Sequence, residues 1–365
     1  MKKIILRLDL NVPIGKENKI LETARIDAVL PEIKNLSKKN KLIILSHLGR
    51  GEKKDSLKPV ENYLRKKLTK QENENVEVLE NVRFWKGETA VKNSKEFKDT
   101  SKEFASLGDI YINDAFATMH REHASIVGIP KIFKKEKKKV DIGELSKREI
   151  KEIEKSLKLA KNKNKKTLLI LSGAKISTKL PLINKFLDLG ATVFVGGGIA
   201  NQIFKDILNL EIGKSFFEKN FKISTVLEKK ILKAIKNKQL VLPCDVILKN
   251  KKVETVENLQ TTDYMADIGP TTFAILKKEI EKAENIILNG PLGLYEEGFE
   301  SGTLAILKNL KNKKINILIG GGDTLVLTKK LKMSSKDNLF LSTAGGAMLE
   351  YLAKDGKLPG LLALN

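Results

Sequence analysis

The sequence predicts an α/β protein with two doubly wound, Rossmann-like parallel-sheet domains joined by a hinge helix. Short apolar runs alternate with amphipathic helical patterns along the chain. This alternation predicts a mainly parallel sheet with helices on both faces. A length of 365 residues exceeds what one hydrophobic core usually organises. Arginine-containing sets and glycine-rich sets fall in different halves of the chain. We therefore expect the two domains to bind different ligands.

Apolar, often β-branched runs predict the strands, and patterns with a helical period predict the helices between them. We expect strands at 3–8, 41–45, 76–79, 109–113, 167–171, 191–195, 239–242, 285–288, 315–319 and 338–341. The clearest helices are expected at 24–38, 94–106, 176–189, 224–237, 271–284 and 303–312. Ligands of such sheets bind beyond the carboxyl ends of the strands, and the arginine and glycine sets directly follow these strands.

The domain boundary is expected in the charged connector that ends the first half. An N-terminal domain would span residues 1–142, and one amphipathic helix at 143–160 would link it to a C-terminal domain at 161–345. The segment 346–365 is expected to return toward the N-terminal domain.

Composition limits the class of protein. The formal net charge is +23, which suggests an anionic partner, but the lysines are spread along the chain and aromatic residues make up only 5%. A lysine-coated surface explains the charge better than a nucleic-acid-binding function, which stays an alternative. No apolar run is long enough to cross a membrane, no export signal is visible, and Cys244 is the only cysteine. A cytoplasmic globular protein is expected.

The N-terminal half predicts an anion site made of side chains. Arginine can offer paired donors to carboxylate and phosphate oxygens, and an arginine at the start of a helix is better explained by an anion than by the helix dipole. The only histidines are His47, His120 and His123, and no cysteine or spaced carboxylate joins them, so they are expected to donate to an anion rather than bind a metal. The candidate binding residues are Asp9, Asn11, Arg25, His47, Arg50, Arg83 and Arg121.

The C-terminal half predicts a nucleotide site made largely of backbone. SGAKIS follows a strand and opens a helix, which places N–H groups with Lys175 and Lys179 where phosphates would bind. Glu296 in NGPLGLYE suits ribose hydroxyls, and Asp323 in GGGDT suits magnesium on phosphates. The chain has no Walker A loop. Its GGG at 196–198 lacks the GxGxxG spacing, so a nicotinamide-dependent dehydrogenase is a weak alternative.

A series of motifs in order resembles the phosphoglycerate kinase family. It comprises RLDLNVP, ARI, SHLGR, SLKPV, LENVRF, INDAFATMHREHAS, SGAKISTK, GGGIAN, DIGP, NGPLGLYE, IGGGDT and STAGGAMLE, and it spans nearly the whole chain. One departure is Ala344, where the family usually has glycine. If that position needs a positive φ, alanine would cost roughly 1–2 kcal/mol.

The resemblance implies a reaction and a role for each site. The family transfers a phosphoryl group reversibly between 1,3-bisphosphoglycerate and ADP, giving 3-phosphoglycerate and ATP, and acts as a monomer whose domains close about a hinge. By similarity, the side chains of the first half would bind the phosphoglycerate. ADP or ATP would be bound by Lys175, Lys179, Gly293, Glu296, Gly321, Gly322, Asp323 and Thr324.

Catalysis is expected to rely on positioning and charge neutralisation. Arg25 and Lys179 are predicted to clamp the transferring group, assisted by the helix N-terminus at Gly345 and Gly346. Asp323 would help to hold Mg²⁺, and substrates are expected to bind apart before the domains close.

Overall fold

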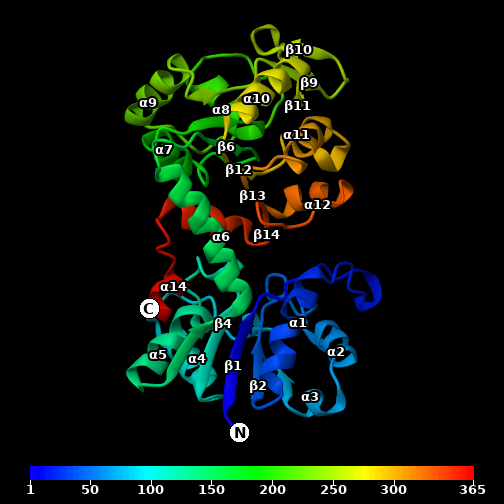
Figure 1. The fold of residues 1–365 in the computed structure, drawn as a ribbon, viewed down its shortest axis with the longest axis vertical. Coiled ribbons are helices and arrows are strands. Elements are labelled where there is room, and N and C mark those ends of the chain that lie inside the picture. Colours follow the sequence, from blue (N-terminus) through cyan, green and yellow to red (C-terminus); the bar gives the residue numbers. More distant parts are fainter. The chain divides into compact units, whose positions relative to one another are not determined.

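The computed structural model describes residues 1–365 as two compact units. The first contains Met1–Lys151 together with Lys354–Asn365, and the second contains Glu152–Ala353. Figure 1 shows that each unit has a sheet with helices packed around it. None of the helices combines the length and the apolarity that crossing a membrane requires.

The sheet of the first unit has five parallel strands in the order β3-β2-β1-β4-β5. Central strand β1 pairs with both β2 and β4, and Ile4 lies opposite Leu42 on one side and Ile110 on the other. The strands are β1 (Lys3–Leu8), β2 (Lys41–Leu45), β3 (Val76–Val78), β4 (Ile110–Asp114) and β5 (Lys139–Ile142). The sequence did not predict β5, because its apolar residues alternate with charged ones in a lysine-rich stretch.

Helices bury the faces of this sheet. Leu6, Leu8 and Ile44 of the sheet pack with Ile26 and Leu64 of two helices in one apolar cluster. The last helix returns to this unit, where the Gly360 N–H donates to the Met119 carbonyl at 2.8 Å. The helices are α1 (Ala24–Ser37), α2 (Lys58–Lys67), α3 (Lys70–Glu74), α4 (Lys95–Ala105), α5 (Ile129–Lys135) and α14 (Pro359–Leu364).

The main sheet of the second unit has six parallel strands in the order β14-β13-β12-β6-β7-β8. They are β6 (Thr167–Leu171), β7 (Thr192–Val195), β8 (Leu240–Val241), β12 (Asn285–Asn289), β13 (Asn316–Gly320) and β14 (Leu339–Ser342). Both faces of β6 and β12 are buried, which explains their continuous apolar sequences.

A small antiparallel sheet in the second unit was not predicted. Its order is β10-β9-β11, with β9 (Asp245–Leu248), β10 (Val253–Thr255) and β11 (Met265–Ile268). Each strand has at most four residues and lies among polar residues, so the apolar period is too short to be recognised.

The helices of the second unit follow the predicted alternation. Their bounds are α7 (Leu180–Asp188), α8 (Gly197–Asp206), α9 (Thr225–Lys236), α10 (Pro270–Lys282), α11 (Ser301–Lys311), α12 (Gly322–Lys330) and α13 (Gly345–Ala353). The predicted helix at 176–189 begins only at Leu180, and Pro181 occupies its first turn, where proline is favoured.

The long helix α6 (Glu144–Lys161) runs from one unit into the other. Its N-terminal turn is held by two carboxyl groups. Asp114 accepts from the Ser146 N–H at 2.6 Å, and Glu32 Oε1 accepts from the Glu144 N–H at 3.4 Å. Burial, and next the hydrogen bond with Asp114, raise the pKa of Glu32 to about 8. This raised pKa favours a protonated Glu32 at neutral pH.

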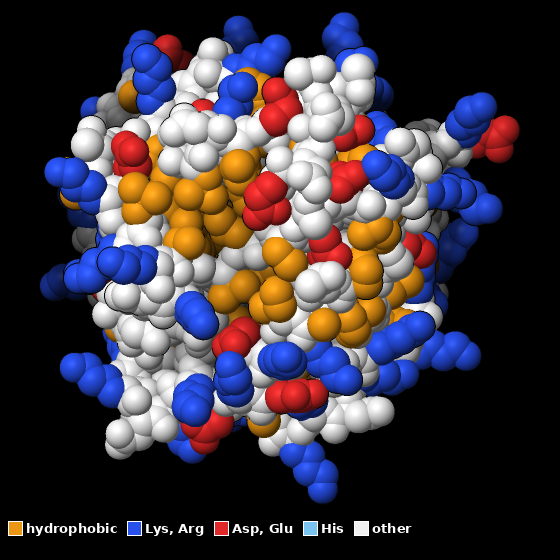
Figure 2. Space-filling view, turned by 90° about the horizontal axis from the view of Figure 1, so that it is seen from above, with side chains coloured by type: hydrophobic (Ala, Val, Ile, Leu, Met, Phe, Trp, Pro, Cys, Tyr) orange, Lys and Arg blue, Asp and Glu red, His pale blue; other side chains and the backbone are white.

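Exposed lysines occur along the whole chain. On the face that Figure 2 presents, they do not form one continuous basic stripe. There, Lys and Arg project around the rim with Asp and Glu among them, and hydrophobic side chains gather nearer the centre. This pattern on that face differs from the concentrated basic footprint typical of nucleic-acid binding.

Replacing Glu32 with glutamine should make the free energy of unfolding less dependent on pH. Because the folded-state pKa of Glu32 is raised, its stabilising contribution is fully present below its ordinary pKa of 4.5 and is lost as the pH rises through about 8. Urea unfolding at a series of pH values should show Glu32→Gln gaining stability relative to the wild type across this window. A constant difference between pH 4 and pH 9 would contradict the assignment.

Candidate active site

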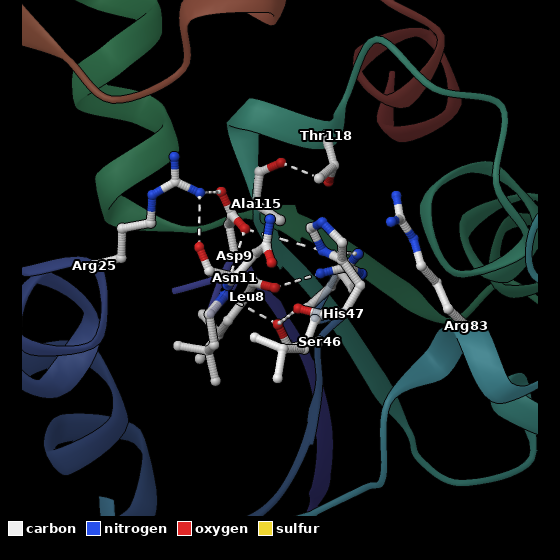
Figure 3. Close-up of polar contacts among 12 residues, drawn as sticks. Leu8, Asp9, Asn11, Arg25, Ser46, His47, Arg83, Ala115 and Thr118 are labelled. Carbon is white, nitrogen blue, oxygen red and sulfur yellow. Dashed lines mark hydrogen bonds and ion pairs between the residues drawn. The ribbon is translucent and has the colours of Figure 1, made fainter. Parts of the chain in front are cut away.

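Three parallel strands of the first unit bring their C-terminal loops to one edge of the sheet. Asp9 and Asn11 follow β1, His47 follows β2, and Arg83 lies in the short 3₁₀ helix Val82–Phe84 after β3. Figure 3 shows these side chains around the strand ends, with Arg25 approaching from the start of α1. These residues are far apart in the sequence, and the pairing of β1, β2 and β3 as neighbouring strands brings them together.

Arg25 joins the loop after β1 to its own helix. Its Nη1 donates to Asp9 Oδ2 at 2.8 Å and to the Asn11 carbonyl at 3.2 Å, as Figure 3 shows. The Asn11 side chain in turn accepts from the Gly49 N–H at 2.9 Å, which ties this loop to the one after β2. One third of the Arg25 side chain stays exposed (34%), so part of the guanidinium can reach a ligand.

His47 is buried beside an arginine that the sequence argument missed. Arg7, within β1, is only 1% exposed, and its Nη2 lies 3.4 Å from His47 Nδ1. Burial, followed by the charges of Arg7, Arg83 and Arg121, lowers the pKa of His47 far below its ordinary value. His47 is therefore neutral. Arg7 could have been found because a charged residue interrupts the apolar run KIILRL at a strand position that should be buried.

The positive charges at this edge destabilise one another. Burial, then the charges of Arg121 and Arg7, lower the pKa of Arg83. The Arg83 Nη1 donates to the Gly49 carbonyl, while its buried Nε has no acceptor. Cations that repel one another, with one buried donor left free among them, form a site that an anion would stabilise.

Two of the predicted arginines remain at the surface. Arg121 is exposed but lies close enough for its charge to act on His47 and Arg83. Arg50 is also exposed. Its backbone N–H donates to Asp55 Oδ2 at 2.8 Å. The Arg50 side chain does not join the hydrogen-bond network of the other site residues.

Asn81 holds two of these loops together. It is completely buried, and its Nδ2 donates to the Leu48 carbonyl at 2.8 Å and to the Asp55 carbonyl at 2.7 Å. Its Oδ1 accepts from the Arg83 N–H at 3.1 Å. Sequence reasoning missed this role, because an asparagine after a strand most often marks only a turn.

The second unit contains a pocket of about 390 Å³. Among the predicted residues, Gly293, Glu296 and Asp323 line it. Much of the remaining lining is apolar and was not predicted, including Phe204 and Leu292. A mostly apolar pocket with a few polar groups at its edge suits a flat aromatic base with a polar extension.

The two lysines of the SGAKIS loop are placed differently. Lys179 is largely buried and its Nζ donates to the Ser172 carbonyl, beside Gly290. Burial lowers the pKa of Lys179 to about 8, against an opposing effect of Asp323. Lys175 is exposed and does not line the pocket.

Two helices begin next to each other beside the pocket. Gly321 precedes α12 with a φ of 100°, and a Cβ on Gly345 would lie 2.8 Å from the Gly321 Cα, so the start of α13 abuts that of α12. Gly322 opens α12, and Gly345 and Gly346 open α13; the N–H groups at such helix starts favour anions. Ala344 is not among the residues with positive φ, so it carries no backbone strain of that kind.

Side chains around Asp323 hold the neighbouring loops. Thr324 is completely buried, and its hydroxyl accepts from the Gly290 N–H at 3.0 Å, so it shapes the loop. The Tyr295 hydroxyl donates to Asp323 Oδ1 at 3.0 Å. Tyr295 was missed because nothing in its spacing links it to Asp323.

The family is decided by comparison with known proteins. The family model described as Phosphoglycerate kinase matches residues 1–355. The chain belongs to the phosphoglycerate kinase family. It is a phosphotransferase of that family, and nothing in the comparisons supports a dehydrogenase or a nucleic-acid-binding protein.

Relatives of this family match over the whole chain. A phosphoglycerate kinase of Buchnera aphidicola is 37% identical and one of Clostridium tetani is 36% identical, each over 100% of this chain and 95% of the relative. The solved structure of phosphoglycerate kinase from Coxiella burnetii has a TM-score of 0.80 at 33% identity, covering 100% of this chain and 96% of the other. The structure from Pyrococcus horikoshii has a TM-score of 0.77 at 27% identity and the same coverage.

Replacing Asn81 with alanine should destabilise the first unit by roughly 2–3 kcal/mol, because two buried carbonyls would lose their donor. Denaturant unfolding measures this change. Asn35→Ala, at an exposed position of α1, is the matched control and should stay within about 0.5 kcal/mol of the wild type. Equal stabilities of the two variants would show that Asn81 does not hold the loops.

Proposed function

We propose that the chain transfers a phosphoryl group reversibly between 1,3-bisphosphoglycerate and ADP, giving 3-phosphoglycerate and ATP, with Mg²⁺. The observation that carries this proposal is the crowding of Arg7, Arg83 and Arg121 around neutral His47, which a bound anion would relieve. Family membership supports the reaction. We further propose that the enzyme works as a cytoplasmic monomer, as the family resemblance implies.

On the phosphoglycerate side, two of the proposed contacts use guanidinium groups with a donor left free, those of Arg25 and Arg83. Arg25 would bind the acyl phosphate with the part of its guanidinium not paired to Asp9. Arg83 and Arg121 would bind the other phosphate, and His47 would donate to an oxygen. Asp9 and Asn11 would hold the substrate hydroxyl, and Arg50 would approach from the exposed rim.

On the nucleotide side, the apolar pocket would hold the base, and Glu296 would bind the ribose hydroxyls. Lys175 and Lys179 would bind phosphates together with the N–H groups at Gly321, Gly322, Gly345 and Gly346. Lys179 would contact the terminal phosphate. Gly293 would let the nucleotide approach the backbone, and Thr324 would act through the loop it holds.

Asp323 suits Mg²⁺ in this site. Its carboxylate is a hard oxygen ligand at the edge of the pocket, oriented by Tyr295, and Mg²⁺ commonly combines one or two carboxylates with phosphate oxygens and water. When bound, the ion would neutralise phosphate charge during transfer.

The reaction needs no general base, because the attacking oxygens of a carboxylate and of ADP are already deprotonated. The residues therefore act by binding, in-line orientation and neutralisation of charge. A coupled assay of the purified chain with 1,3-bisphosphoglycerate and ADP tests the proposal. ATP formation is expected, and its absence with correctly folded protein would overturn the proposed activity.

Replacing Arg25 or Lys179 with alanine should each lower kcat by about 10²- to 10³-fold, because each would remove a preorganised donor to the transferring group. Steady-state kinetics in both directions measures the effect. Lys229→Ala, at an exposed position of α9, is the control for loss of one positive charge and should retain normal turnover. Near-normal turnover in Lys179→Ala would contradict its assignment.

Nucleotide affinity should fall as the pH rises through about 8, because the Lys179 ammonium loses its charge there. Calorimetric titration with ATP between pH 6.5 and 9.5 measures this dependence. Lys179→Met should bind ATP more weakly at pH 7 and show a flatter profile. A wild-type profile as flat as that of the variant would indicate that Lys179 is not in contact with the nucleotide.

A further inference from the structure

A buried polar network lies beneath the arginine cluster and has no part in the proposed ligand contacts. Arg7 is 1% exposed and Glu88 is completely buried. Ser125 lies between them: its Oγ donates to Glu88 Oε1 at 2.7 Å, and the same oxygen accepts from Arg7 Nε at 3.0 Å. The Ser125 N–H donates to Glu88 Oε2 at 2.8 Å, so both carboxylate oxygens are occupied.

The network holds two buried charges in a defined geometry. Burial lowers the pKa of Arg7, and the charge of Glu88 is the largest opposing effect. Tyr111 fixes the segment further, since its hydroxyl donates to the Ser125 carbonyl at 2.6 Å. Buried ion pairs often stabilise a protein no better than apolar residues of similar size. Stability alone therefore does not explain why these charges are buried here.

The geometry of Arg7 has a consequence for the protons of His47. A guanidinium has only N–H donors, so Arg7 Nη2, which lies 3.4 Å from His47 Nδ1, makes that nitrogen an acceptor. The other nearby group, Asp9 Oδ1, is 3.9 Å from Nδ1, which is too far for a hydrogen bond. In a neutral imidazole whose Nδ1 accepts, the proton is on Nε2.

We propose that Glu88 and Ser125 are positioning residues that hold Arg7 so that it fixes His47 as the neutral Nε2–H tautomer. His47 then presents one defined donor. The identity of the ligand that accepts this hydrogen bond, phosphoglycerate, rests on the proposed function. The tautomer itself is a property of the free protein.

Nuclear magnetic resonance of the ¹⁵N-labelled full-length protein tests the proposal directly. Long-range ¹H–¹⁵N correlations distinguish the two tautomers, and with only three histidines the His47→Gln spectrum assigns the signals. The wild type is expected to show His47 as the Nε2–H form near neutral pH. Ser125→Ala and Glu88→Gln should each give a mixture of tautomers. In Ser125→Ala the Arg7 Nε loses its acceptor, and in Glu88→Gln the network loses its negative charge.

A matched control separates the change in the His47 tautomer from the general effect of losing a buried carboxylate. Glu72 caps α3 in the same unit through a capping box with Thr69. Glu72→Gln should leave the His47 signals unchanged. Steady-state kinetics adds a second readout: Glu88→Gln should raise KM for 3-phosphoglycerate about 10-fold with little change in kcat, corresponding to one weakened hydrogen bond to charge.

The outcomes are distinguishable. An Nδ1–H or doubly protonated His47 in the wild type overturns the proposal even if the variants fail to fold. So does a folded Ser125→Ala or Glu88→Gln variant with the wild-type tautomer and KM. A wild-type Nε2–H form that is lost in the variants, in a protein without kinase activity, would support the positioning network while refuting the proposed function.

Discussion

Strands β1 to β4 run in the same direction, and this parallel arrangement places the loops that follow them at one edge of the first sheet. Residues separated by more than a hundred positions, such as Arg7 and Arg121, thereby bring like charges together. Repulsion between them is only partly offset by Asp9 and Glu88. We propose that the unrelieved remainder makes this edge an anion site. Its loops are held in place by buried polar groups such as Asn81.

The second unit meets the same physical problem in a different way. The groups that we propose to bind anions there are mainly backbone N–H groups at the starts of α12 and α13, which lie against each other. Only Lys179 contributes a buried positive charge, and burial lowers its pKa. The pocket beside it is largely apolar. We therefore propose that one unit binds by side-chain charge and the other by backbone and shape, which suits a phosphoglycerate and a nucleotide respectively.

Much of this could be predicted from the sequence, because long apolar strands and the motifs after them are local signals. The parallel sheets were predicted and are confirmed by the structure and its relatives. The antiparallel sheet at β9, β10 and β11 could not be predicted, since its short strands carry little periodicity. The buried partners Arg7 and Glu88 were also missed, because their pairing through Ser125 depends on contacts between distant segments. The exposure of Arg50 and Lys175 depends on side-chain directions that spacing does not reveal.

We propose that the two units bind different ligands through separate sets of residues. Calorimetric titration of the full-length protein with 3-phosphoglycerate and with MgADP tests it most directly, using Arg83→Ala and Asp323→Ala. We expect Arg83→Ala to weaken 3-phosphoglycerate binding at least about 10-fold and to leave MgADP binding unchanged, and Asp323→Ala to do the reverse. If either folded variant weakens both ligands equally, or neither ligand, the assignment of the two sites is wrong.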